Sequence, residues 1–249
     1  EAERLGQRGM LHLYREELER AQADLEESLS IHRAQGNRVG EGSILGNLAV
    51  LHNARGDLER ARQLSEEALE LAREVGNRRV EAVLMNNLGL LLSEQGGGAR
   101  AEGLFGASID LAEAIGDTLQ QGLAMGNLAN HHSAQDQPES ALRCYLRGLE
   151  LDRRAGNRRG ECVTLGNLGD FYIGRGEVDS ALGSLDESLQ IAQSLGYRTA
   201  LGAFGSTRAL GLALQGRTKE ASEAIAESLT QLEAAGNPGE SFKARCIEL

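Results

Sequence analysis

Four asparagines recur at a constant spacing of forty residues, and their side chains are well suited to recognition. They are Asn47, Asn87, Asn127 and Asn167. A side-chain amide offers one acceptor and two donors, which match the amide and carbonyl groups of an extended peptide backbone whatever its sequence. The same groups can instead bond to neighbouring helices or to water and hold the repeat spacing without a ligand. The pattern leaves both interpretations open and favours recognition.

Four arginines form a second series just after the turns between repeat units. They are Arg38, Arg78, Arg158 and Arg198. Glutamates lie close to three of them in the sequence, at Glu41, Glu81 and Glu161. The arginines could read an acidic partner, or they could be solvated turn residues that pair with these glutamates and contribute little to stability. The second interpretation is favoured.

The histidines and cysteines do not indicate a catalytic or metal site. His12, His52 and His132 share one repeat position, but they stand in different units, and ligands one or two units apart are too distant for one ion. The cysteines are odd in number, lie far apart and include no Cys-x-x-Cys pair; they are Cys144, Cys162 and Cys246. No set of nucleophile, base and oxyanion donor emerges. We therefore predict a protein without catalysis, cofactor or metal.

The constant spacing comes from an internal repeat of forty residues. Glycine returns at Gly36, Gly76, Gly116, Gly156, Gly196 and Gly236. Alanine returns at Ala21, Ala61, Ala101, Ala141, Ala181 and Ala221. A repeat of this period indicates an array in which each unit buries its apolar face on the next, so the repeat decides the architecture.

Each unit contains the signals for two helices. In the second unit, Asn37 and Asp57 are suited to cap helices that run to about Ala54 and about Val75. Glycines follow these helices and suit left-handed helix ends. The prolines fit the same scheme, because Pro138 and Pro238 fall at the first position of an expected helix, where the missing amide hydrogen costs nothing.

Small residues mark the expected crossing points of the two helices in each unit. They are Gly9, Ala49, Gly89, Ala129, Gly169 and Ala209. The third unit carries additional glycines in its second helix, at Gly96, Gly97, Gly98, Gly103 and Gly106. Since each glycine inside a helix costs about 1 kcal/mol relative to alanine, we expect the amides of residues 96–110 to exchange faster than those of their counterparts at 176–190.

The stretches Met85 to Leu91 and Gly46 to Leu51, together with the fixed alanines, resemble the tetratricopeptide repeat in its forty-residue form. They are similar to repeats of kinesin light chains. The stretch Asn37 to Gly42 resembles repeats of the spindle-orientation adaptor and of bacterial signalling proteins. The resemblance implies an all-α, right-handed superhelical solenoid of about six helix-turn-helix repeats plus a partial terminal helix.

On this resemblance the whole chain, residues 1–249, is expected to be a single solenoid domain. The expected units are 1–36, 37–76, 77–116, 117–156, 157–196 and 197–236, with a partial unit at 237–249. The chain starts at Glu1 without an initiator methionine and ends inside the expected seventh unit. We therefore expect it to be a fragment of a longer protein.

The resemblance also implies that the first helices of the units line a concave groove, so that the four repeated asparagines point into it. Their expected neighbours in the groove are Ser43, Val83, Leu123 and Val163 one turn earlier, and Val50, Leu90, Asn130 and Asp170 one turn later. Asn86, beside Asn87, belongs to the predicted site as well. The arginines that meet acidic peptides in the spindle adaptor are missing here, which favours an apolar or mixed peptide segment.

Composition restricts the partners. A net charge of −11 argues against a nucleic-acid or anionic-membrane surface, since both require clustered lysine and arginine. The sequence contains no apolar run close to the roughly 20 residues of a membrane span, and the cysteine usage suggests a cytoplasmic protein. We predict an interaction scaffold that binds a peptide or protein segment within a larger regulatory protein. The alternative is self-association, or an autoinhibitory sensor arm that contacts another domain of a multidomain signalling protein.

Overall fold

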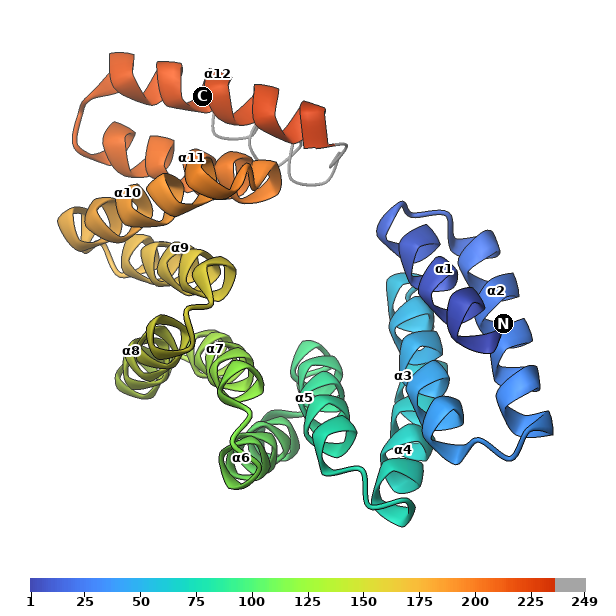
Figure 1. Cartoon of the computed structure of the whole chain (residues 1–249). Coiled ribbons are helices and arrows are strands. Elements are labelled where there is room, and N and C mark those ends of the chain that lie inside the picture. The colour runs from blue at the N-terminus through green and yellow to red at the C-terminus, as the bar shows by residue number, and fades with distance from the viewer. Residues whose placement is uncertain (236–249) are drawn as a thin grey trace. The chain divides into compact units, whose positions relative to one another are not determined.

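A computed structural model gives the structure, which describes residues 1–235. These residues form twelve helices and no strand (Figure 1). The helices are α1 (Ala2–Tyr14), α2 (Leu18–Ala34), α3 (Arg38–Ala54), α4 (Leu58–Glu74), α5 (Arg78–Glu94), α6 (Gly98–Ala114), α7 (Thr118–Ala134), α8 (Pro138–Ala155), α9 (Arg158–Gly174), α10 (Val178–Leu195), α11 (Arg198–Leu214) and α12 (Thr218–Ala235). The all-α prediction is confirmed. Gly236, Pro238 and the predicted partial unit lie outside the described residues.

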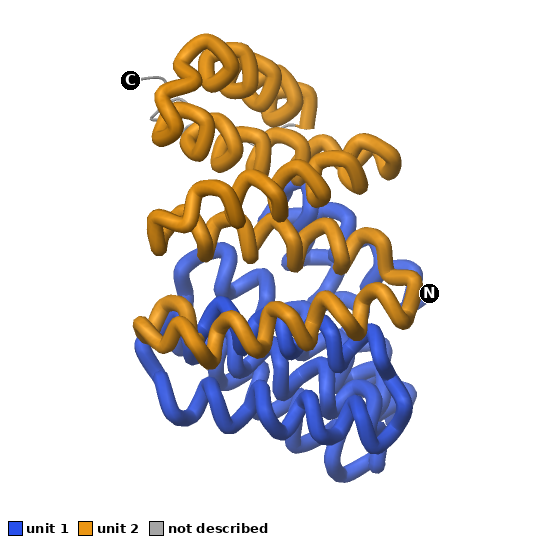
Figure 2. Tube along the Cα trace, turned by 90° about the vertical axis from the view of Figure 1, so that its left-hand side faces the viewer, with its two compact units in different colours: residues 1–131 blue, residues 132–249 orange. Residues whose placement is uncertain are grey.

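The chain divides into two compact units, residues 1–131 and 132–249, which are coloured separately in Figure 2. In the first unit α1 packs on α2, α3 on α4 and α5 on α6, and each pair packs on the next. In the second unit α9 packs on α10 and α11 on α12, while α8 packs on α9 and α10 on α11. Each unit is therefore a stack of helix pairs, as the repeat predicts.

The predicted helix starts are confirmed. They could be predicted because they depend on local hydrogen bonds. The Asn37 side chain accepts from the Gly40 amide at 3.0 Å, and Asp57 accepts from the Arg60 amide at 3.3 Å. Pro138 is the first residue of α8. Such caps satisfy amide groups that the first turn leaves without a partner.

The turns between helices require a left-handed residue. Gly56 and Gly76 adopt φ values of 78° and 67°, which glycine tolerates because it has no Cβ atom. Glu16 and Asp136 stand at the same turn position and also have positive φ, 60° and 54°. Side chains can thus replace glycine at this turn, although the conformation is uncommon for them.

The histidines that share one repeat position form hydrogen bonds across these turns. The His52 Nδ1 atom lies 3.2 Å from Asp57 Oδ2, across the turn from α3 to α4. His12 makes the same contact with Glu17, and His132 makes it with Gln137, both at 2.6 Å. Their partners are the residues that precede the second helices, so these imidazoles have a structural role in the turns.

Small residues allow the helices of a pair to approach closely, as predicted. A Cβ atom added at Gly9 would lie 2.8 Å from Leu25 Cγ, and one at Gly89 would lie 2.9 Å from Phe105 Cε1. Leu25 and Phe105 are fully buried. The glycines thus make room for large core side chains on the second helix.

The glycine-rich second helix of the third pair should open more readily than its counterparts. In α6, a Cβ atom at Gly103 or Gly106 would meet no other atom within 4 Å, so these glycines are not required by packing. Each costs about 1 kcal/mol relative to alanine. We expect the amides of residues 96–110 to exchange faster than those of residues 176–190 in native-state hydrogen exchange. Gly103→Ala and Gly106→Ala should remove much of the difference, and equal protection in the unchanged protein would contradict the prediction.

Candidate functional site

The candidate site of the first unit lies on one side of its first helices. In α5, Val83, Asn87 and Leu90 are spaced by four and three residues, so they share one side of the helix. We call the equivalent positions of three helices the ladder face. It consists of Ser43, Asn47 and Val50 on α3, Val83, Asn87 and Leu90 on α5, and Leu123, Asn127 and Asn130 on α7.

The helices that carry the ladder face are held beside one another. α3 packs on α5, and a hydrogen bond from Asn127 Nδ2 to Asn86 Oδ1, at 3.0 Å, ties α7 to α5. The opposite side of each helix is buried, as Leu45 on α3 and Leu88 on α5 illustrate. Core packing therefore fixes which side of the first helices remains available to a ligand.

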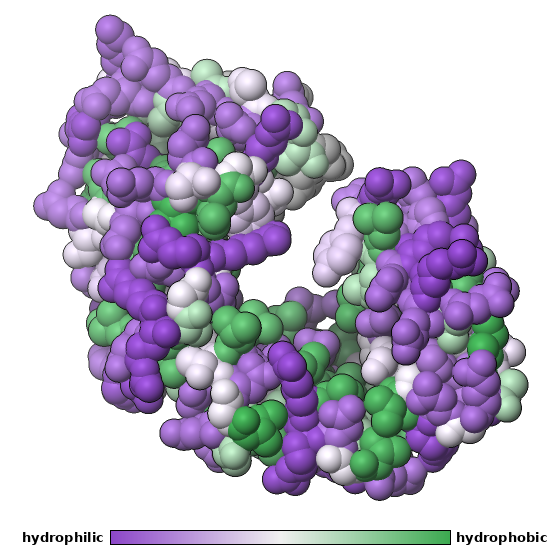
Figure 3. All heavy atoms as spheres, in the orientation of Figure 1, coloured by the Kyte–Doolittle hydropathy of each residue, from purple (hydrophilic) through white to green (hydrophobic). Residues whose placement is uncertain are grey.

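Apolar side chains remain at the surface of the ladder face. Val83 is 37% exposed, Leu90 40% and Leu123 57%, and Val50 is exposed as well. Figure 3 shows hydrophobic atoms at the surface of the molecule among hydrophilic ones. Apolar side chains that remain exposed on neighbouring helices are typical of a surface that another molecule covers.

Three of the four repeated asparagines keep their amide groups available. Asn47, Asn87 and Asn167 are half-buried, and within residues 1–235 their side chains form no hydrogen bond. Partly buried amides normally find partners in the protein or in water. These side chains therefore retain the donors and acceptor that the recognition hypothesis requires.

Asn127 and Asn86 differ from the other asparagines. Asn86 is only 2% exposed, and its oxygen accepts the hydrogen bond from Asn127. For this pair the structural interpretation applies, because the amide of Asn127 donates to the buried oxygen of Asn86 across two helices. Asn86 therefore holds Asn127 in place and has almost no surface to offer a ligand.

The second unit carries the corresponding positions on α9, and they are less apolar. Val163 and Asn167 are half-buried, and Asp170 is exposed. The position that holds Val50 and Leu90 in the first unit holds a carboxylate here. The exposed apolar side chains of the predicted site thus all belong to the first unit, whereas Val163 in the second is half-buried.

The arginines after the inter-unit turns pair with glutamates, as the favoured interpretation predicts. The distance from the arginine Nη1 atom to the glutamate Oε2 atom is 3.1 Å for Arg38 and Glu41, 3.6 Å for Arg78 and Glu81, and 2.5 Å for Arg158 and Glu161. The three glutamates are between 4% and 6% exposed. Each pair lies within one helix, and because its carboxylate is buried it is more than a solvated turn contact.

A second arginine, at the end of the preceding helix, bonds to each of these glutamates and forms a joint between units that the sequence did not predict. Arg33 at the end of α2 donates to Glu41 at 2.8 Å. Arg73 and Arg153 make the same bond with Glu81 and Glu161. The hydrogen bond from Arg33 lowers the pKa of Glu41. A spacing of eight residues between arginine and glutamate, repeated in three units, is the sequence signal that could have revealed these joints.

The described residues show no arrangement for metal chemistry. Within 1–235, no three His, Cys, Asp or Glu side chains lie together as metal ligands. Cys162 is buried, burial raises the pKa of its thiol, and its sulfur lies 3.4 Å from the Ser188 carbonyl oxygen. No helix in this part of the chain is long and apolar enough to cross a membrane.

The helix pairs at a period of forty residues, the glycine turns and the close helix crossings together point to a family of helical repeats. The tetratricopeptide repeat family model matches residues 2–74 and 79–154, more than half of the chain. The chain belongs to the tetratricopeptide repeat family. Proteins of this family typically act as interaction scaffolds without catalysis.

Solved structures of this family share the fold. BtubC (BKLC) from P. vanneervenii superposes with a TM-score of 0.74 at 21% identity, over 89% of this chain and 92% of that one. A signal transduction ATPase with numerous domains from Pyrococcus horikoshii, which has a tetratricopeptide repeat sensor, gives 0.75 at 17% identity, over 99% of this chain and 37% of that one. A Rap protein complexed with competence and sporulation factor gives 0.74 at 10% identity, over 98% and 73%. No curated protein matches the sequence.

Proposed function

We propose that this chain binds a segment of a partner protein along the ladder face, as the interaction module of a larger cytoplasmic regulatory protein. The observation that carries the proposal is the combination of exposed apolar side chains with half-buried amides that have no partner in the described chain. The fold supports it, since similar structures include a sensor and a complex with a factor. No catalytic role is included.

The chemistry of the face defines the ligand. Val83, Leu90 and Leu123 can cover apolar side chains of the partner. Asn47 and Asn87 can bond to its backbone, which makes part of the binding independent of sequence. The ladder face contains no arginine or lysine. An apolar or mixed segment therefore fits better than an acidic one, and rigid helices keep the entropy cost of binding low.

The test is selection from a peptide library, followed by affinity measurements on two variants. In the first variant Val83, Leu90 and Leu123 are all serine; in the second, Asn47 and Asn87 are both alanine. Each lost hydrogen bond should cost on the order of 1 kcal/mol of binding energy, so the second variant, which loses two, should bind about 30-fold more weakly. Burial of the three apolar side chains should matter more, with a loss of about 100-fold.

The controls separate binding from folding. Asn127 is left unchanged, because its loss would leave the buried Asn86 oxygen without a partner. A matched variant, Leu146→Ser with Leu214→Ser, removes exposed leucines that lie off the ladder face and should bind as the parent does. Helicity and thermal unfolding are checked for every variant. If folded ladder-face variants keep the parent affinity, the proposed site is wrong.

Exposed apolar residues near the amino terminus favour a second candidate function. Tyr14 is 80% exposed and Leu11 is exposed on the same helix, α1. These side chains suit self-association, or contact with another domain of the same protein in a sensor arm. Light scattering over a range of concentrations distinguishes self-association, because a monomer at all concentrations would exclude it.

A further inference from the structure

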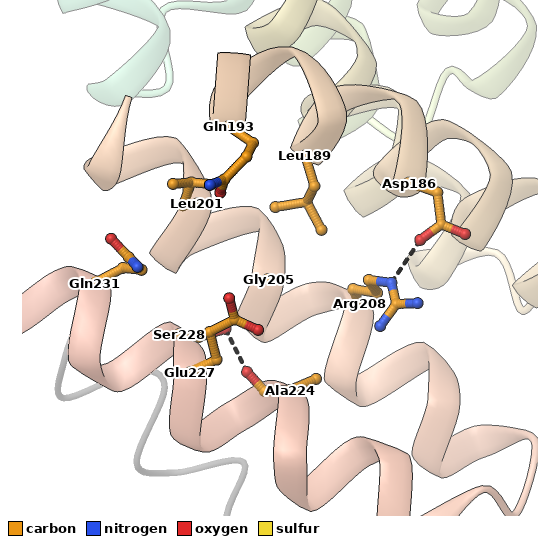
Figure 4. A pocket seen from close by; sticks show the side chains of 10 residues that line it. All are labelled: Asp186, Leu189, Gln193, Leu201, Gly205, Arg208, Ala224, Glu227, Ser228 and Gln231. Atoms are coloured by element: carbon orange, nitrogen blue, oxygen red, sulfur yellow. Dashed lines mark hydrogen bonds and ion pairs between the residues drawn. The ribbon is translucent and has the colours of Figure 1, made fainter. Parts of the chain in front are cut away.

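A pocket of about 250 Å³ lies between α10, α11 and α12 in the second unit (Figure 4). Leu189 on α10 and Leu201 on α11 give it an apolar wall. Asp186, Arg208 and Glu227 supply its charged groups. All of its lining residues come from this one unit, and none belongs to the ladder face.

Two residues that line the pocket, Gly205 and Arg208, are departures of the sixth repeat from the second to fifth repeats. Gly205 stands where earlier units carry leucine or methionine, as at Leu45 and Leu165, and these leucines are buried in the core. Arg208 stands where Leu168 fills the preceding unit. Neither position therefore carries the leucine side chain that fills the core of other units. At Gly205 a Cβ atom would meet the Ser228 hydroxyl, so the glycine is also required by close packing on α12.

The charged side chains of the pocket differ in whether they have a partner. Arg208 Nε lies 2.5 Å from Asp186 Oδ1, so these two residues neutralise each other. Glu227 forms no ion pair or hydrogen bond with any residue of 1–235. Figure 4 shows its carboxylate directed toward the space between Leu189 and Leu201. The net charge of the lining is therefore negative, and its one unpaired charge lies beside an apolar wall.

We propose that this pocket holds the side chain of a lysine or arginine from a partner protein. The aliphatic stem would lie against Leu189 and Leu201, and the cationic head would pair with Glu227. Long basic side chains commonly bury their stems while the charge finds a partner at the surface. Gly205 and Arg208 lie on the side of α11 opposite to the positions that correspond to the ladder face. The pocket is therefore a second recognition site, independent of the proposed function.

The test is an NMR titration of the chain with capped tripeptides, read from the amide shifts of Leu201, Gly205 and Gln231. The probes are Ala-Lys-Ala, Ala-Arg-Ala and Ala-norleucine-Ala, which keeps the stem but lacks the charge. We expect the basic peptides to bind about fivefold more tightly than the norleucine peptide, the ratio for a partly exposed ion pair. Equal affinity for the norleucine peptide would overturn the proposal.

Two variants make the titration specific. Glu227→Gln should abolish the preference for the basic peptides, whereas Glu223→Gln, an equal change on α12 outside the pocket, should retain it.

If n-pentylammonium binds more tightly than the tripeptides, the pocket belongs to a free amine and not to a protein. The sequence also contains Lys243 and Arg245. A tenfold gain in affinity when both are changed to glutamine would assign the pocket to the chain's own side chains.

Discussion

Gly169→Ala should destabilise the protein by about 1 to 2 kcal/mol, although alanine is the better helix former. Gly169 lies where α9 crosses α10, and an added Cβ atom would lie 2.5 Å from Leu185 Cγ and 2.7 Å from its Cδ2. Leu185 is fully buried, so it has no free space to move into. Overpacking typically costs about 1 to 3 kcal/mol, and a separation of 2.5 Å places this site in the upper part of that range, so the cost exceeds the gain of about 1 kcal/mol in helix propensity.

Gly183→Ala is the matched control, and it should have the opposite sign. Gly183 lies within α10, the helix that crosses Gly169, and a Cβ atom there would meet no other atom within 4 Å. Alanine should therefore stabilise the protein by about 1 kcal/mol. Free energies of unfolding from urea titrations measure both changes. If the two substitutions shift stability in the same direction, close crossing does not explain the glycine at position 169.

The fold could be predicted because its signals are local and repeated. Asn37 caps a helix through a bond to an amide three residues later, and Gly56 needs only its own backbone conformation. Once one unit is assigned, the period of forty residues assigns the others. Even the exceptions at Glu16 and Asp136 keep the turn, because the surrounding helices fix the chain path there.

The site could be predicted only in part, because its properties depend on neighbours from other units. The sequence places Asn86 and Asn87 side by side, yet one is buried against Asn127 and the other is half-exposed without a partner. The ends of Arg33 and Arg73 reach glutamates on the following helix, and no local pattern states how buried those glutamates are. The pocket beside Gly205 depends on three helices at once.

Asp152→Asn should stabilise the protein near neutral pH by about 1 kcal/mol. Asp152 is 4% exposed, and it accepts hydrogen bonds from Asn157 Nδ2 at 2.7 Å and Thr164 Oγ1 at 3.1 Å. Neither donor is charged, and burial raises the pKa of Asp152. A raised folded-state pKa means that the ionised carboxylate costs stability at neutral pH. An asparagine keeps an acceptor for Asn157, and the Thr164 hydroxyl can turn to accept from its amide.

Glu41→Gln is the same kind of change at a second buried carboxylate, and it should destabilise the protein by about 1 to 2 kcal/mol. Glu41 accepts from the guanidinium groups of Arg33 and Arg38, and the bond from Arg33 is the main cause of its lowered pKa. Hydrogen bonds between charged groups are stronger than those between neutral ones. A carboxylate with a lowered pKa contributes stability above its unfolded-state value, near 4.3, and loses it as the pH falls through the folded-state value.

At pH 7 the free energy of unfolding should therefore be higher than the parent's for Asp152→Asn and lower for Glu41→Gln. Both differences from the parent should become smaller in acid. For Asp152 the difference shrinks as the pH falls through its raised folded-state pKa, because protonation of the parent removes the buried charge. For Glu41 it shrinks below about pH 4.3, because protonation of the parent removes the acceptor charge that Arg33 requires. Urea unfolding at a series of pH values measures both curves. If Asp152→Asn destabilises the protein at pH 7, hydrogen bonding to Asn157 and Thr164 outweighs desolvation, and the charge of Asp152 is a source of stability in the same way as that of Glu41.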